Sequence, residues 1–262
     1  MLSAIASPLP RLDFSTDVPS TSSHEIDGVA RGLGVYHGGR CIVGEGIGIG
    51  APLALVGDRA VFPLDTKTVQ SGNRITRRFY MNGLSLKFIG RVRADLPYKW
   101  IRSKLAPLYL KSSGFRPIFN YLMAARTVIG LKSHYRRTKS LGFVDVTYRT
   151  GHDRVRVEVD ANRLGANKFL IANELDGHLF EHVIVDESTQ ITKIPPWLEI
   201  SGNSAKLVAP SLGFGFRLNH VSRCRLFVGR EILGGRLNWA GFSYMPDHDL
   251  STFSYEVVFE ND

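Results

Sequence analysis

Two short stretches combine histidine with carboxylate residues at spacings that chemistry can use. Residues His178 to His182 read HLFEH, the H-x-x-E-H spacing that on a helix sets two histidines on one zinc ion. The stretch follows the turn-forming pair Asp176-Gly177 and runs into VIVD, which favours a strand. On a strand the two histidines would stand roughly 13 Å apart at their roots. We therefore predict no metal and no cofactor here.

The second stretch is MPDHDLS, which contains Asp247, His248 and Asp249. A carboxylate beside a histidine can orient or charge the imidazole for acid–base chemistry. The same residue types are also ordinary between two strands. One hypothesis is therefore a carbohydrate-active enzyme of lyase, hydrolase or epimerase type. Its His/carboxylate set would lie in a cleft, with four catalytic candidates: His178, His182, Asp247 and His248.

The charge distribution supports a different hypothesis. The net charge is +9 and the isoelectric point is about 9.7. Residues Lys67 to Lys139 hold 17 Lys or Arg and one acid, Asp95, out of totals of 33 basic and 24 acidic residues. Such asymmetry within one chain indicates an anionic partner. The alternative is that the two sets of charges meet on folding or between subunits.

Ten aromatic residues are interspersed in this basic segment. Cations with aromatic rings can bind nucleic acid, an anionic lipid headgroup or an acidic glycan. The first hypothesis is therefore a binding protein for an anionic or carbohydrate-type ligand, through a basic, aromatic-rich surface or groove. The predicted anion-binding residues are Arg77, Arg78, Arg91, Arg93, Arg136, Arg137 and Lys139, and the predicted stacking residues are Tyr98, Trp100 and Tyr135.

Period-2 alternation of apolar and polar residues dominates the chain and predicts strands. Residues 143–149 and 155–159 alternate around a TGHD turn, which predicts a hairpin. Two further hairpins are predicted at Asp176-Gly177 and at Asn82-Gly83. We expect an all-β, mainly antiparallel fold: a large two-sheet β-sandwich or distorted barrel, with one or two inserted helices around residues 98–131.

The segment 96–140 is predicted to be a basic, partly helical insertion in a single sandwich domain that spans residues 1–262. Apolar residues from Phe115 to Ile129 fall at helical spacing. Ser112 or Ser113 would cap this helix, and Pro117 fits its first turn.

The stretch GEGIGIGAP, residues 44–52, has glycine at every second place. It lacks the third glycine of a dinucleotide-binding loop and the Gly-Lys-Ser/Thr of a phosphate-binding loop. Strict alternation instead predicts a strand with one bare face, with Ile47 and Ile49 on the other face. That bare face would be covered by a large aromatic from the opposite sheet or would lie beneath a ligand.

The remaining features bound the class of protein. No apolar run is long enough to cross a bilayer, and the first residues do not read as a signal peptide. Cys41 and Cys224 lie far apart and form no metal-binding or disulfide pattern. These features favour a cytoplasmic protein. A third hypothesis is a scaffold that self-associates into a homo-oligomer through its oppositely charged halves.

Overall fold

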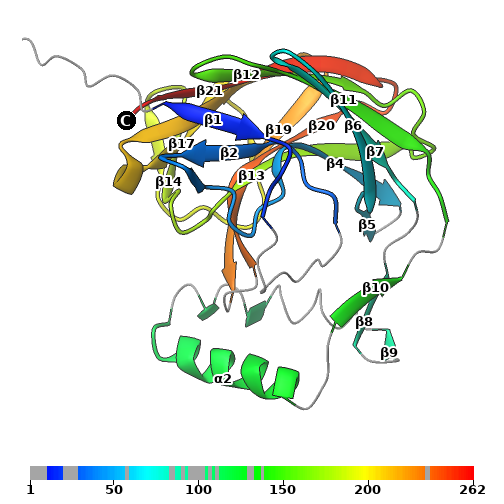
Figure 1. Ribbon diagram of the computed structural model, residues 1–262. Helices are drawn as coiled ribbons and strands as arrows, with labels where there is room; N and C mark the ends of the chain where they lie inside the picture. Colours follow the sequence, from blue (N-terminus) through cyan, green and yellow to red (C-terminus); the bar gives the residue numbers. More distant parts are fainter. Residues whose placement is uncertain are drawn as a thin grey trace, which may run out of the picture.

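Two antiparallel sheets packed face to face form the body of the molecule (Figure 1). The computed structural model describes residues 11–19, 29–56, 59–82, 86–89, 92–93, 104–105, 108–109, 112–128, 133–136, 139–233 and 237–262. The predicted all-β, mainly antiparallel sandwich is confirmed.

The larger sheet has nine strands. In spatial order they are β15 (Thr189–Ile191), β14 (His182–Val185), β17 (Ser204–Ala209), β18 (Phe214–Asn219), β21 (Thr252–Asn261), β12 (Arg154–Asp160), β11 (Phe143–Thr150), β7 (Arg74–Tyr80) and β6 (Asp65–Ser71).

The smaller sheet of the sandwich has six strands. In spatial order they are β16 (Leu198–Ile200), β19 (Cys224–Leu233), β20 (Leu237–Pro246), β13 (Lys168–Leu175), β4 (Gly48–Val56) and β5 (Arg59–Val61). Two three-stranded sheets complete the described strands: β1 (Leu12–Ser15), β2 (Gly34–His37) and β3 (Arg40–Cys41), and β8 (Leu86–Ile89), β9 (Val92–Arg93) and β10 (Ser133–Arg136).

Alternation builds the core between the two sheets. Val146 of β11 and Val157 of β12 are fully buried, and they meet Phe242 and Leu226 of the six-stranded sheet in one apolar cluster. The hairpin predicted around the TGHD turn forms, because β11 pairs with β12 in antiparallel register. The inward residues of each strand thus supply the apolar surface that holds the sheets together.

Within the GEGIGIGAP stretch, Tyr148 of the nine-stranded sheet covers Gly50 of β4, whereas Gly48 lies against the backbone of Leu33 and Gly46 against that of Glu174. A Cβ on Gly50 would lie 2.7 Å from the Tyr148 ring, and the Tyr148 hydroxyl donates to the Gly50 carbonyl at 3.2 Å. Gly48 and Gly50 have φ of 78° and 72°. Such turns of the backbone break simple alternation, so Ile47 and Ile49 lie in different apolar clusters, contrary to the prediction.

Two of the predicted hairpins are wrong. β7 ends before Asn82-Gly83 and pairs with β6 and β11, whereas β8 belongs to a separate sheet. After Asp176-Gly177 the chain crosses from the six-stranded sheet to β14 of the nine-stranded sheet. Gly177 is needed there for close packing rather than for a hairpin turn, since a Cβ would lie 2.7 Å from the Trp239 carbonyl oxygen.

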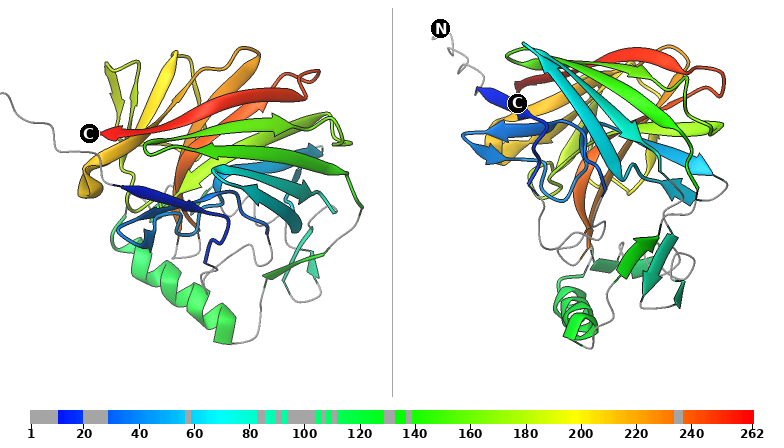
Figure 2. Two further views of the ribbon diagram at one scale, coloured as in Figure 1. Left: turned by 45° about the horizontal axis from the view of Figure 1, so that its top comes forward. Right: turned by 45° about the vertical axis from the view of Figure 1, so that its right-hand side comes forward.

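The predicted helix is present as α2 (Phe115–Val128). The Ser112 hydroxyl accepts a hydrogen bond from the Phe115 amide at 3.3 Å, as expected of a cap. All views place α2 and the β8–β10 sheet on the same side of the sandwich (Figures 1 and 2). Phe119 of α2 packs with Ile232 and Leu233, so the β19–β20 hairpin anchors the helix. Within the described part of the chain, no helix has the length and apolarity to cross a membrane.

Candidate anion-binding surface

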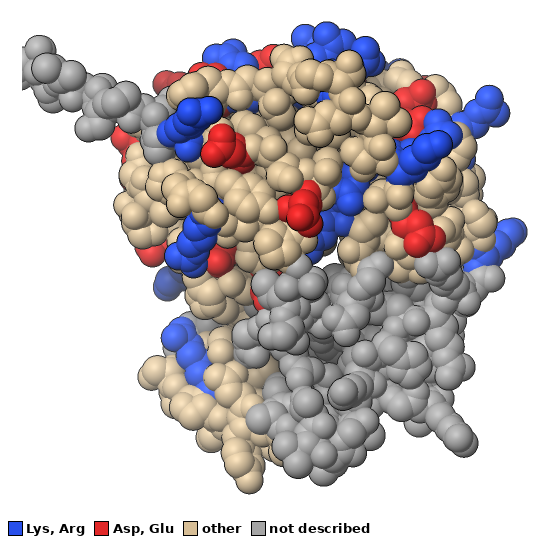
Figure 3. Space-filling view, in the orientation of Figure 1, with Lys and Arg blue, Asp and Glu red and all other residues tan. Residues whose placement is uncertain are grey.

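The outer face of the nine-stranded sheet gathers charged side chains from several strands. In β11 and β12 the inward valines alternate with outward polar residues, so Arg149, Arg156 and Glu158 face solvent. Figure 3 shows basic side chains along the upper rim of the molecule, where Figure 1 labels β12 and β11. The position of these charges follows from strand alternation and register, both of which are set by the buried face.

Three arginines stand side by side across three neighbouring strands. Arg74 of β7 lies opposite Arg149 of β11, and Arg149 lies opposite Arg156 of β12. We call these three residues the arginine row. Neighbouring strands are about 4.8 Å apart, and like charges directly opposite each other destabilise a sheet. Without compensating carboxylates such a row would oppose folding.

One carboxylate, that of Glu158, forms ion pairs with two of the three arginines in the row. Glu158 lies 3.2 Å from Arg149 and 3.5 Å from Arg156, and the two arginine side chains are each about half exposed. Among the described residues, no carboxylate lies within 4.0 Å of Arg74. The row thus has donors that remain accessible to a ligand from solvent.

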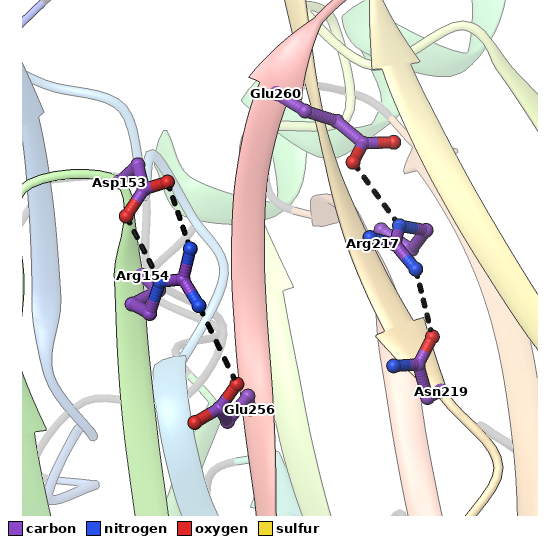
Figure 4. A network of polar contacts seen from close by, with 6 residues as sticks. All are labelled: Asp153, Arg154, Arg217, Asn219, Glu256 and Glu260. Carbon is purple, nitrogen blue, oxygen red and sulfur yellow. Dashed lines mark hydrogen bonds and ion pairs between the residues drawn. The ribbon is translucent and has the colours of Figure 1, made fainter.

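A second pair of arginines continues the surface on either side of β21 (Figure 4). Arg154 lies 3.0 Å from Asp153 and 4.0 Å from Glu256. The hydrogen bond from Arg154 is the main reason why the pKa of the Asp153 carboxyl is lowered. Arg217, on the other side of β21, lies 3.1 Å from Glu260.

Beyond Arg217 the face is hollowed into a cleft of about 310 Å³. Lys206 of β17 lies opposite Arg217 of β18 in the strand register, and both cations approach Glu260, at 3.8 Å and 3.1 Å. The Lys206 ammonium also donates to the Asn261 carbonyl at 2.9 Å. The residues that line the cleft are Ile184, Glu187, Ser204, Lys206, Arg217 and Glu260. The cleft therefore presents charges of both signs together with a hydroxyl.

This arrangement is suited to binding. Guanidinium groups present paired N–H donors that match a carboxylate, sulfate or phosphate. Carboxylates between them, such as Glu158 and Glu256, accept hydrogen bonds from ligand hydroxyls. A ligand with both anionic groups and hydroxyls would use both kinds of group on this face.

The four catalytic candidates from the sequence lie in two regions. His178 is exposed, and its amide donates to Asp176 at 2.9 Å. His182 begins β14 on the outer face, two residues before Ile184 of the cleft. The HLFEH stretch is not helical, so it lacks the geometry of a helical zinc site. Among the described residues, no three His, Cys, Asp or Glu side chains are placed to hold a metal ion.

Asp247 and His248 follow the far end of β20. Arg223 lies 3.5 Å from Asp247 and also pairs with Asp249, while the His248 side chain is 84% exposed. His178 lies near the start of this ten-residue strand, because its neighbour Gly177 contacts Trp239. Ten residues of strand span roughly 30 Å. The structure does not bring His178 together with Asp247 and His248.

The predicted anion-binding residues that are described have three different environments. Arg77 points inward and donates to the carbonyls of Thr16 and Gly32, and burial lowers its pKa. Arg78 faces outward and forms a two-bond pair with Asp145, at 2.8 and 2.7 Å, and this hydrogen bonding raises the pKa of Arg78. Lys139 is exposed.

The other predicted binding residues are not tested by the geometry. Those outside the described residues are Arg91, Arg137, Tyr98 and Trp100, and those described only as backbone are Arg93 in β9 and Arg136 and Tyr135 in β10.

The sequence analysis missed the arginine row, although the pairing of Arg149 with Arg156 could have been predicted. The TGHD turn sets Arg149 opposite Arg156 once the hairpin register is counted outward from the turn. The pairing of Arg74 with Arg149 joins strands about seventy residues apart, which no local pattern reveals.

Comparisons with known proteins give neither a family nor an activity. No protein-family model matches this chain, and no curated protein matches it in sequence. Several distant structural neighbours are carbohydrate-active enzymes. One is an α-N-acetylgalactosaminidase from Bifidobacterium bifidum in complex with GalNAc, at 10% identity and a TM-score of 0.47, covering 96% of this chain and 35% of that chain.

Two further structures show a similar degree of likeness. The 4-alpha-glucanotransferase from Thermococcus litoralis has 7% identity and a TM-score of 0.39, over 82% of this chain and 27% of that chain. A galactose mutarotase-like protein from Clostridium acetobutylicum has 8% identity and a TM-score of 0.28, over 80% and 75%. This chain spans about a third of the length of the α-N-acetylgalactosaminidase and of the 4-alpha-glucanotransferase. All three TM-scores are below 0.5, and a likeness of fold at this level does not imply a shared function.

Proposed function

We propose that the protein binds an acidic carbohydrate, a sugar chain bearing carboxylate or sulfate groups, on the outer face of its nine-stranded sheet. The observation that carries the proposal is the arginine row, in which Arg149 lies directly opposite both Arg74 and Arg156. Glu158 compensates part of this positive charge, and an anionic ligand would bridge the donors of the row that remain exposed. Arg217 and Lys206 extend the positive charge to the cleft on the same face.

Two observations favour an acidic sugar over a nucleic acid or a membrane. Of the described large apolar residues that are exposed, Val69 of β6 is the one that stands on this face beside the row. The aromatic rings of Tyr80 and Phe143 on this face are half-buried and contact each other, and Arg78 covers Phe143, which leaves little ring surface for base stacking. Glu158, Glu256 and Glu260 would repel a uniformly anionic phosphate surface but would accept hydrogen bonds from sugar hydroxyls.

The test is a binding titration in a salt series, with heparin, polygalacturonate, single-stranded DNA, duplex DNA and anionic liposomes as probes. We expect heparin or polygalacturonate to bind most tightly, with an affinity that falls as salt rises. The triple variant R74Q/R149Q/R156Q should bind about tenfold or more weakly, since charge-assisted hydrogen bonds are lost. Its salt dependence should also be shallower.

The matched control is R40Q, which removes an exposed arginine of β3 outside the nine-stranded sheet. It should bind as the wild type does. A loss of binding free energy in R40Q of about one third of that in the triple variant would show that every removed charge counts equally and that binding depends only on net charge, against the proposal. Preferential binding of DNA or liposomes would replace the carbohydrate with that ligand.

A further inference from the structure

The outer face of the six-stranded sheet carries an aromatic platform beside a matched ion pair. Trp197 precedes β16 and is 46% exposed, and its ring stacks on Phe227 of β19 with centroids 4.4 Å apart and an angle of 23° between the ring planes. Phe227 itself is buried. With one face of the indole on Phe227 and nearly half of the residue exposed, the opposite face of the indole is open to solvent.

The ion pair borders this platform. Glu199 lies opposite Phe227 in the register of β16 and β19, and Arg225 lies two residues from Phe227 on the same strand. The Arg225 Nε donates to Glu199 at 2.8 Å, and a second hydrogen bond joins the same groups. The Arg225 guanidinium carbon also lies 4.9 Å from the centroid of the Phe227 ring. Alternation on two adjacent strands thus places Glu199, Arg225 and Phe227 together on the outer face, and stacking on Phe227 adds Trp197 to them.

The backbone holds Trp197 in place. Trp197 follows Pro195 and Pro196, which restrict the chain before it. The Arg230 amide donates to the Pro195 carbonyl at 3.1 Å, and a Cβ on Gly229 would lie 2.3 Å from the Pro196 oxygen. The absence of a side chain at Gly229 is therefore what allows this segment to lie against β19. A ligand would meet a ring that is already positioned, so little conformational entropy is lost on binding.

We propose that this platform, formed by Trp197, Phe227, Arg225 and Glu199, binds a neutral sugar ring, independently of the acidic-carbohydrate surface on the other sheet. The open face of the indole takes the apolar face of the sugar. The rim of the platform supplies donors from Arg225 and acceptors from Glu199 to the ring hydroxyls. Because Arg225 is matched by Glu199, the site carries no excess charge and favours a neutral ligand over an acidic one.

The experiment is a calorimetric titration of the full chain with neutral oligosaccharides, namely the hexaoses of α-1,4-glucose, β-1,4-glucose, β-1,4-mannose and β-1,4-N-acetylglucosamine. We expect at least one of them to bind with an affinity that changes little between low and high salt. The W197A variant should weaken this binding about tenfold or more, as expected for a central tryptophan. W197F should retain part of the binding.

Two further variants keep the test specific. Y121A removes an exposed aromatic from α2 and should leave the binding unchanged. E199Q leaves Arg225 without its carboxylate partner and should shift the preference of the site from the neutral hexaose towards an acidic oligosaccharide. Melting temperatures of E199Q and Y121A should stay close to that of the wild type, because Glu199 and Tyr121 are exposed, whereas W197A should melt at a lower temperature because it uncovers Phe227.

Absence of binding to all four hexaoses would overturn the proposal. So would binding that W197A leaves intact, or a W197A effect confined to self-association in sedimentation experiments. Binding of the hexaose should persist in R74Q/R149Q/R156Q, whose arginines lie on the other sheet. Failure of the acidic-carbohydrate surface would therefore leave this site untouched, and the two proposals can be told apart.

Discussion

The two sheets of the sandwich use their outer faces in opposite ways. The nine-stranded sheet buries one face and exposes the other, where Arg149, Arg156 and Glu158 stand in solvent. The six-stranded sheet is buried on both faces over much of its area, since Leu53 and Ala172 of its outer face are 8% and 1% exposed. One sheet therefore exposes charged side chains on its outer face, whereas the outer face of the other is largely buried and apolar, with Trp197 exposed beside β16.

The comparison shows that the period-2 pattern of a strand does not by itself tell whether its outward face is exposed to solvent. A one-sided sheet alternates apolar with polar residues, whereas a sheet buried on both faces reads as a continuous apolar run. β13 reads KFLIANEL, and only Lys168 at its start is exposed. β12 reads RVRVEVD, with strict alternation of burial. A charge introduced on the outer face should thus have very different effects on the two sheets.

The largest effect is expected from a charge placed on the outer face of β13. In A172D an ionised carboxylate would replace a methyl group that is 1% exposed. We expect the free energy of unfolding to fall by about 3–5 kcal/mol, the range for an unpaired buried charge. V69D, at a residue of β6 that is 62% exposed, should change it by about 0.5 kcal/mol or less. Equal losses in chemical denaturation of the two variants would contradict the difference between the sheets.

A smaller effect is expected where the two sheets touch at a glycine. G50A places a methyl group 2.7 Å from the Tyr148 ring at a φ of 72°. Strain and overpacking together should lower the free energy of unfolding by about 2–4 kcal/mol. The control is G72A, since Gly72 also has a positive φ, 58°, but nothing lies within 4 Å of the added methyl group. G72A measures the cost of a positive φ alone, and we expect it to lower the free energy of unfolding by about 1 kcal/mol. An equal loss in both variants would show that contact with Tyr148 adds no cost at Gly50.

The smallest effect has the opposite sign. R149T removes the central member of the arginine row and places a β-branched residue beside Arg74 and Arg156. Relief of repulsion should raise the free energy of unfolding by about 0.2–1 kcal/mol. The same variant should bind heparin or polygalacturonate more weakly. A variant that is less stable than the wild type in thermal denaturation at low salt would show that Glu158 already compensates the row.

Local sequence patterns predicted the fold class, the β11–β12 hairpin and helix α2. They failed where the decision depended on distant segments. Asn82-Gly83 and Asp176-Gly177 have the composition of hairpin turns, yet the strands beside them pair elsewhere, because burial of whole strands outweighs the preference of a two-residue turn. The basic segment drew attention to residues 67–139, but only Arg74 of the arginine row lies within it. Arg149 and Arg156 come from a region of mixed charge, where composition gives no signal.

The sequence by itself determined which face each strand could bury, because apolar side chains at alternate positions point to the same side of the sheet. It also determined the turn around Asp153 and the missing side chain at Gly50, which leaves room for Tyr148. The tertiary structure decided which charges became neighbours. It set Arg74 beside Arg149, and it set Trp197 on Phe227 above the Arg225–Glu199 pair. Such sites depend on register between strands that are distant in sequence, and that register is set by the packing of the whole core.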